Sequence, residues 1–214
     1  MGVTALLKNS IAENLVRRTP GIYSRLARLI RRSEQMSLAE RRALRDELTE
    51  KTLRQAATTP YSKRAGLKGI YDEWPILEKE VLRREGSGCT ATTLVPAHAA
   101  STGGTTGIPI LLKRSLESVV FEQAMLDYLV NKHAGLNLKT ARVAVLRGDV
   151  VKRPDDMMLP HWRLRHAGLH LICSSFHLNA ATINDYIESI RDFGPDILWV
   201  YPSSLEVLVR LGGQ

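Results

Sequence analysis

Cysteine, aromatic residues and long apolar runs are all scarce in this sequence. Its 214 residues include only two cysteines, Cys89 and Cys173, which lie far apart along the chain. A disulfide framework or a structural zinc site is therefore not expected, and a reducing, cytoplasmic setting fits best. No apolar run approaches the roughly 20 residues that span a bilayer, and the N-terminus lacks a signal-peptide core. We therefore expect a protein without a membrane span.

The net charge of +8 is concentrated in the first part of the chain. Residues 1–86 carry 18 basic and 11 acidic side chains, whereas residues 87–214 carry 12 and 11. A basic excess of this size is the ordinary property of a solvated helical surface. Aromatic residues make up only 6% of the chain and hardly interleave with the basic ones, so we do not expect nucleic-acid binding.

The hydrophobic periodicity predicts two regions with a boundary near residue 86. Residues 1–86 are expected to form a helical N-terminal region, with a capping box at Ser37 and Glu40. In residues 87–214 strand-like runs alternate with helical ones, which is typical of an α/β domain with a largely parallel, helix-flanked sheet. We expect strands at 90–95, 110–113, 141–146, 169–173 and 196–200, helices at 116–133, 181–191 and 203–211, and a loop at 150–166.

A stretch rich in glycine and threonine, residues 101–109, is the most unusual feature of the sequence. We call it the Gly/Thr loop. Glycine lets main-chain N–H groups approach a ligand closely, and neighbouring hydroxyl groups add donors. No Gly-Lys-Ser/Thr ends the stretch, so it is not a Walker A loop; a plain hairpin loop is the alternative. The residues predicted to bind phosphate are Ser101, Thr102, Gly103, Gly104, Thr105, Thr106 and Gly107.

Four polar segments each follow a predicted strand. They are residues 101–109, 147–149, 174–177 and 201–204. In parallel sheets with flanking helices, ligands bind at the carboxyl ends of the strands. The sequence therefore predicts a binding site where these segments meet.

The Gly/Thr loop, with the sequence STGGTTGIP, resembles the phosphate-binding loop of adenylate-forming (AMP-forming) ligases. It is most similar to the branch of phenylacetate–coenzyme A ligases and CapK-type capsular polysaccharide biosynthesis proteins. Other segments resemble that branch in the same order along the chain, and together they cover about residues 70–214. These segments are residues 75–81, 142–149, 174–178 and 193–204.

This resemblance implies the N-terminal half of a ligase that adenylates a carboxylate with ATP and Mg²⁺. The acyl group would then pass to coenzyme A or another nucleophile. His177 would lie beside the acyl carboxylate, and Tyr201, Ser203 and Ser204 would line the substrate pocket. Structural roles stay open for these residues: His177 as a helix-capping or core-edge histidine, and a serine as the cap of the last helix.

Two departures from the family pattern leave an alternative function open. Many members carry a lysine after the last loop glycine, where this chain has Ile108, although Lys113 or Arg114 could supply the cation. Family members also contain a stretch that binds adenine and ribose, followed by a small C-terminal domain with a catalytic lysine. This sequence has no counterpart of either. We therefore expect an incomplete sheet, completed by a C-terminal half or a second copy. The alternatives are a non-catalytic remnant or scaffold with weak nucleotide binding and, less favoured, a basic helical adaptor for acidic partners.

The glycines of the loop give a first test. If backbone N–H groups hold phosphates, Gly104→Val and Gly107→Val should reduce ATP binding and carboxylate-dependent pyrophosphate release more than Thr105→Ser, because a branched Cβ blocks close approach. Thr106→Ala should fall between them, losing a hydroxyl donor worth roughly 1 kcal/mol. The assay needs this chain together with any C-terminal half. Pyrophosphate release at the parent rate in both glycine variants would mean an ordinary hairpin loop.

Overall fold

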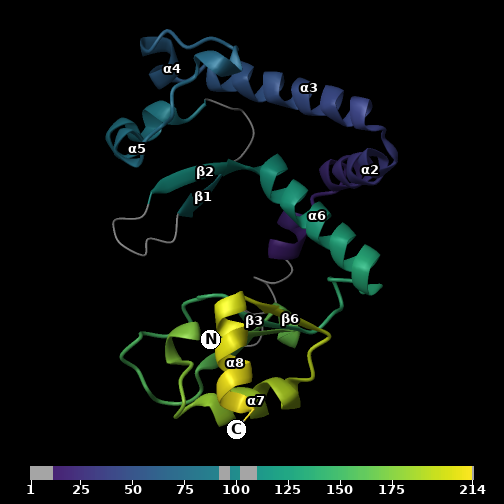
Figure 1. Cartoon of the computed structure of the whole chain (residues 1–214), viewed down its shortest axis with the longest axis vertical. Helices are drawn as coiled ribbons and strands as arrows, with labels where there is room; N and C mark the ends of the chain where they lie inside the picture. Colours follow the sequence, from purple (N-terminus) through teal and green to yellow (C-terminus); the bar gives the residue numbers. More distant parts are fainter. Residues whose placement is uncertain (1–11, 92–96, 102–109, 214) are drawn as a thin grey trace. The chain divides into compact units, whose positions relative to one another are not determined.

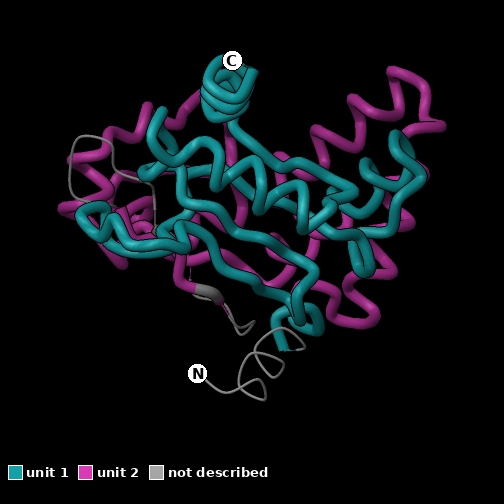
Figure 2. The backbone as a smooth tube through the Cα atoms, turned by 90° about the horizontal axis from the view of Figure 1, so that it is seen from below, with its two compact units in different colours: residues 1–16, 126–214 teal, residues 17–125 magenta. Residues whose placement is uncertain are grey.

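The computed structural model describes residues 12–91, 97–101 and 110–213 and has a mixed α/β fold (Figure 1). It divides into two compact units, coloured separately in Figure 2. Unit 1 comprises residues 1–16 and 126–214, and unit 2 comprises residues 17–125. The expected domain boundary near residue 86 stays a prediction.

Unit 2 begins with helices. They are α2 (Ile22–Gln35), α3 (Leu38–Ala56), α4 (Pro60–Arg64) and α5 (Lys79–Glu85), with short 3-10 helices at Tyr71–Glu73 and Gly86–Cys89. The predicted capping box is present: Ser37 Oγ accepts from the Glu40 N–H at 3.3 Å, and Glu40 Oε2 accepts from the Ser37 N–H at 2.7 Å. All regular structure described between residues 12 and 91 is helical, as the periodicity predicted.

A two-stranded antiparallel hairpin completes unit 2. It pairs β1 (Ala97–Ser101) with β2 (Leu111–Ser115) and leads into α6 (Leu116–Ala134). Of the strand predicted at 90–95, residues 92–96 lie outside the described residues, and residues 90–91 are not in a strand. The expectation that the strand before the Gly/Thr loop belongs to the parallel sheet was wrong, because that strand is β1, which pairs with β2 in a separate sheet. The reason is geometric, since a short loop joins antiparallel strands, whereas parallel strands need a long crossover.

The sheet of unit 1 has the strand order β4-β5-β3-β6. Its strands are β3 (Val143–Leu146), β4 (Trp162–Arg165), β5 (His170–Cys173) and β6 (Ile197–Val200). The pairs β3–β5 and β3–β6 are parallel, as expected, whereas β4 runs antiparallel to β5. Residues 150–166 were predicted to form a loop, and this was wrong for the part that forms β4. The strand is short, carries two arginines and lies at the sheet edge, so it lacks the apolar run of a buried strand.

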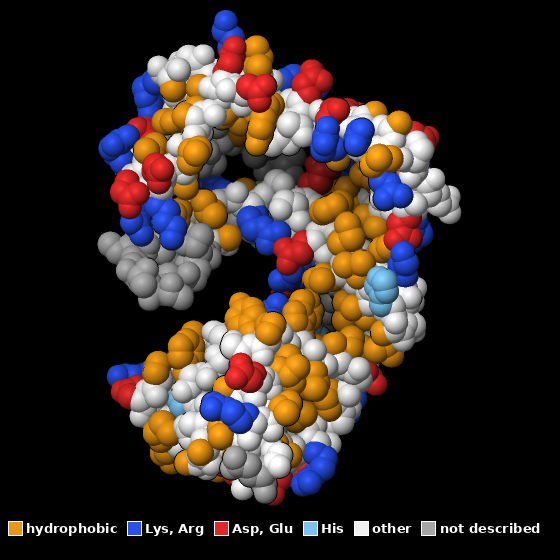
Figure 3. All heavy atoms as spheres, viewed as in Figure 1, with side chains coloured by type: hydrophobic (Ala, Val, Ile, Leu, Met, Phe, Trp, Pro, Cys, Tyr) orange, Lys and Arg blue, Asp and Glu red, His pale blue; other side chains and the backbone are white. Residues whose placement is uncertain are grey.

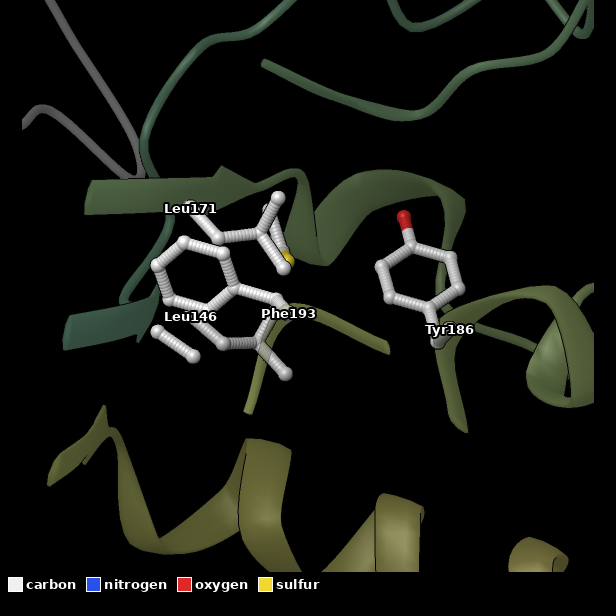
Figure 4. Packing of buried hydrophobic residues seen from close by; sticks show 6 residues of the cluster. Leu146, Leu171, Tyr186 and Phe193 are labelled. Atoms are coloured by element: carbon white, nitrogen blue, oxygen red, sulfur yellow. The ribbon is translucent and has the colours of Figure 1, made fainter. Parts of the chain in front are cut away.

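Helices cover both faces of this sheet. One face packs against α7 (Ile183–Phe193) and α8 (Pro202–Gly212), and Figure 4 shows Leu146, Leu171 and Phe193 packed together there. The opposite face packs against Leu126 and Val130 of α6. Since side chains alternate along a strand, β3 is buried on both sides, and all four of its residues are buried. The expected helix-flanked sheet is therefore present in unit 1.

The edge of the described sheet at β6 carries apolar surface. Strand β6 pairs with β3 on one side and with no other described strand. Leu198 of β6 is 49% exposed, and Leu205 and Val209 on the following helix α8 are also exposed. Figure 3 shows hydrophobic side chains gathered around α8 on this face of unit 1. Apolar surface at an open edge favours pairing with a further strand.

The central strand provides a stability test. Leu146, which is 1% exposed, lies in the cluster under α7, so Leu146→Ala should lower the free energy of unfolding by about 2–5 kcal/mol through lost burial and a residual cavity. The control is Leu164→Ala on β4, a leucine that is 53% exposed, which should cost less than about 1 kcal/mol. Denaturant unfolding followed by circular dichroism measures both. Equal losses in the two variants would contradict the two-faced burial of β3.

Candidate functional site

Three of the four predicted polar segments lie at one edge of the unit 1 sheet. The parallel register pairs Leu146 with Val200 and Val145 with Ile172, so β3, β5 and β6 end together. Residues 147–149, 174–177 and 201–204 follow these three ends. The fourth segment follows β1, in the hairpin of the other unit. The carboxyl edge of the parallel strands is therefore the candidate site of unit 1.

Gly148 is the point where the three segments meet. Its φ of +80° is a conformation that favours glycine. A Cβ added there would lie 3.8 Å from both Ser175 Oγ and Tyr201 Cε2. The Tyr201 N–H donates to the Leu146 carbonyl at 3.1 Å. This bond holds the segment after β6 next to the end of β3. The backbone at Gly148 thus brings a serine hydroxyl and a tyrosine ring next to each other.

Arg147 lies beside this meeting point and stacks on an aromatic ring. Its Cζ is 4.6 Å from the centroid of the Trp199 ring. Asp149 Oδ2 lies 3.9 Å from Arg147 Nε, within ion-pair range but too far for a hydrogen bond. Arg147 Nε is buried and has no hydrogen-bond partner among the described residues. The sequence analysis placed Arg147 in the site segment but did not identify its stacking partner.

His177 is buried in a polar network at the end of β5. It ends the 3-10 helix Ser175–His177 and is 1% exposed. Its Nδ1 lies 2.7 Å from Ser174 Oγ, and the Tyr186 hydroxyl donates to the Ser174 carbonyl at 2.6 Å. The Ser174 N–H in turn donates to the His161 carbonyl at 3.0 Å. These contacts fit the structural alternative, a core-edge histidine that fixes the turn after β5.

A second histidine, His161, stacks on His177. The ring centroids are 4.6 Å apart and the planes differ by 7°. Both side chains are 1% exposed, and His161 Nδ1 and His177 Nε2 have no hydrogen-bond partner in the described part of the chain. Burial lowers the pKa of His161, and the neighbouring His177 adds to this effect. The sequence analysis missed this pair, since residues 150–166 were expected to form a loop.

Burial also keeps two neighbouring groups protonated. It raises the pKa of the Cys173 thiol to about 12 and raises the pKa of the Tyr186 hydroxyl. A nucleophilic thiolate at Cys173 is therefore disfavoured. The protonated Tyr186 hydroxyl can act as the donor that its bond to Ser174 requires.

The three predicted pocket residues around the start of α8 differ in exposure. Tyr201 is 54% exposed, Ser203 is exposed and Ser204 is 8% exposed. Tyr201 occupies the N-cap position of α8, and no side chain caps the helix. The idea of a serine cap was therefore wrong, and Pro202 as the first helical residue accounts for the helix start.

The hairpin of unit 2 borders a separate cavity of about 650 Å³. Thr102–Gly107 lie outside the described residues, and Ser101 is the last residue of β1. Lys113 lines this cavity, and no described residue forms an ion pair with Lys113. The neighbouring Arg114, on the other side of the strand, pairs with Glu122 at 2.5 Å. Of the two cations considered as replacements for the lysine that position 108 lacks, Lys113 is thus the one facing a cavity of ligand size.

No three His, Cys, Asp or Glu side chains gather as metal ligands in the described part of the chain. None of the described helices combines the length and apolarity that a bilayer span requires. No family model, curated protein or solved structure matches this chain. The site and the motif resemblance are therefore the basis of the functional proposal.

Buried His161 predicts a pH-dependent stability. The unfolded chain binds a proton at His161 near the usual pKa of about 6.5, whereas folded His161 resists protonation. Stability should therefore be full at about pH 7.5 and should fall as the pH drops towards about 5.5. His161→Phe keeps a ring in the stack but cannot take up the proton, so it should flatten this slope. Denaturant unfolding at the two pH values measures the effect.

The matched control is His133→Gln at the exposed end of α6, which should keep the parent slope. Asp156 does not contribute in this pH range. Hydrogen bonds from the Met158 N–H and from Lys152 lower the pKa of its carboxyl group, so it titrates at more acidic pH. An unchanged slope in His161→Phe would mean that another group causes the pH dependence.

Proposed function

We propose that this chain is the N-terminal portion of an AMP-forming acyl-activating ligase, similar to phenylacetate–coenzyme A ligases. Such an enzyme adenylates a carboxylate and passes the acyl group to coenzyme A or another nucleophile. The observation that carries the proposal is the order of the motif-like segments combined with their positions. The segments at 147–149, 174–177 and 201–204 each follow a parallel strand and share one edge of the sheet. The sheet would then be part of an incomplete adenylation domain.

Lys113 supports the nucleotide part of the proposal. It projects from β2 into a cavity whose size suits a small-molecule ligand, in the hairpin that carries the Gly/Thr loop. The phosphates of ATP would accept hydrogen bonds from residues 101–107. Lys113 would add a positive point charge beside them. ATP would supply the adenylyl group, with Mg²⁺ sharing the phosphate charge.

The residues of unit 1 divide into two roles under this proposal. Tyr201 and Ser175 border the open side of the strand edge, where they would contact the acid substrate. His177 would act as a positioning residue, because its buried ring holds Ser174 and thereby the turn that carries Ser175. Removing its imidazole should shift this turn and weaken substrate binding without removing a direct contact.

A non-catalytic scaffold with weak nucleotide binding is the second candidate. Ile108 in place of the common lysine and the complete burial of His177 favour it. The discriminating experiment is pyrophosphate release from ATP in the presence of a panel of carboxylic acids. It should be run on this chain and on any longer native polypeptide that contains it. Nucleotide binding without release for any acid would support the scaffold and exclude the ligase.

The adjacent cations on β2 allow a matched pair of variants. Lys113→Met should reduce ATP-dependent pyrophosphate release by about tenfold or more, since a charge-assisted contact to phosphate is lost. Arg114→Met removes the same charge from the other side of the strand, and it breaks the pair with Glu122 and the hydrogen bonds to Ser118 at the start of α6. It should change the rate by less than about threefold. Similar losses in both variants would mean a general charge effect and would count against Lys113 as a phosphate ligand.

A further inference from the structure

We propose that Arg147, stacked on Trp199, binds a second carboxylate of the acid substrate, one that stays ionised throughout the reaction. This inference rests on the proposed function and narrows it, because it makes the substrate a dicarboxylic acid. The site consists of Arg147 with Asp149, Ser175, Trp199 and Tyr201 around Gly148.

The strand register accounts for the position of Arg147. Val145 pairs directly with Trp199 in the parallel ladder, and Arg147, the first residue after β3, lies two residues further along the chain. Its guanidinium therefore reaches across to the neighbouring strand and lies over the indole ring, with 4.6 Å between Cζ and the ring centroid. Stacking restricts the rotamers of the arginine and holds its planar fork in place before a ligand arrives. Preorganisation of this kind lowers the entropic cost of binding.

The hydrogen-bonding capacity of this guanidinium is largely unused. An arginine carries five N–H donors, yet the described residues provide no hydrogen bond to Arg147. Among the described residues it forms one ion pair, with Asp149 at 3.9 Å, and both side chains are a little over one-third exposed. A partly exposed ion pair at this distance contributes little. A carboxylate ligand that accepts two parallel N–H bonds can therefore displace Asp149.

The neighbouring groups favour a carboxylate over a phosphate. Ser175 and the exposed Tyr201 lie next to Gly148, the residue that follows Arg147, and their hydroxyl groups can supply further donors. Asp149 repels any anion, and the repulsion increases with the charge of the ligand. A phosphate group near neutral pH carries up to two charges, whereas a carboxylate carries one.

The bound carboxylate is not the one that is activated. Two charge-assisted bonds from a permanent cation stabilise the ionised ground state of a carboxylate. A carboxylate that attacks phosphorus gives up negative charge, so these bonds would weaken in the transition state and slow the reaction. Arg147 is therefore suited to a group that remains charged, at the opposite end of the substrate.

The test is anion binding by the full chain in the absence of ATP, measured by calorimetry and by the emission of Trp199 beneath the guanidinium. The probes are succinate, with butyrate as a monocarboxylate of the same carbon number, and inorganic phosphate. Succinate should bind at least about tenfold tighter than butyrate and should change the Trp199 emission. In Trp199→Phe the fluorescence change should be lost while calorimetry still detects binding.

Two variants should move succinate affinity in opposite directions. Arg147→Gln should weaken it by about tenfold or more, and Arg147→Lys should restore it only in part. Asp149→Asn removes the competing carboxylate and should tighten succinate binding several-fold, which a purely structural role of Arg147 would not produce. Equal binding of succinate and butyrate, unchanged affinity in Arg147→Gln, or tighter binding of phosphate than of succinate would each overturn the proposal. None of these results depends on ligase activity, so pyrophosphate release tests the proposed function separately.

Discussion

Burial of β3 on both faces is the constraint on which unit 1 depends. Its four residues contact α7 and α8 on one side and the C-terminal part of α6 on the other. With both faces filled by side chains, polar groups can gather next to solvent only beyond the strand ends. The short strands end together because their register is parallel, and this places Gly148, Ser175 and Tyr201 at one edge.

Much of this arrangement could be predicted from the sequence. Buried parallel strands appear as continuous apolar runs, and the runs at 141–146, 169–173 and 196–200 correspond to β3, β5 and β6. The helices α6, α7 and α8 also lie within two residues of their predicted bounds. Strand β4 was not predictable in the same way, because Arg163 and Arg165 mask a strand that pairs on one side only.

The parts of the site that escaped prediction all depend on contacts between distant residues. The stack of Arg147 on Trp199 requires the register between β3 and β6, which are about 50 residues apart in the sequence. The stack of His161 on His177 requires the antiparallel pairing of β4 with β5, because that pairing brings the residue before β4 next to the turn after β5. Local patterns indicate which residues follow a strand, but they do not fix which side chains meet across strands.

The two ends of the candidate site differ in how their polar groups are satisfied. At the end of β5 the polar side chains are buried and hydrogen-bonded to each other or to the backbone, so this side is closed. These side chains are Ser174, His177 and Tyr186. At the ends of β3 and β6, the Arg147 guanidinium has a stacking partner but no hydrogen bond within the described residues, and Tyr201 is exposed. A buried hydrogen-bonded network makes the local structure rigid, whereas a fixed cation with free donors can bind an anion. A ligand at this edge therefore contacts the β3–β6 side, and the β5 side holds the framework in place.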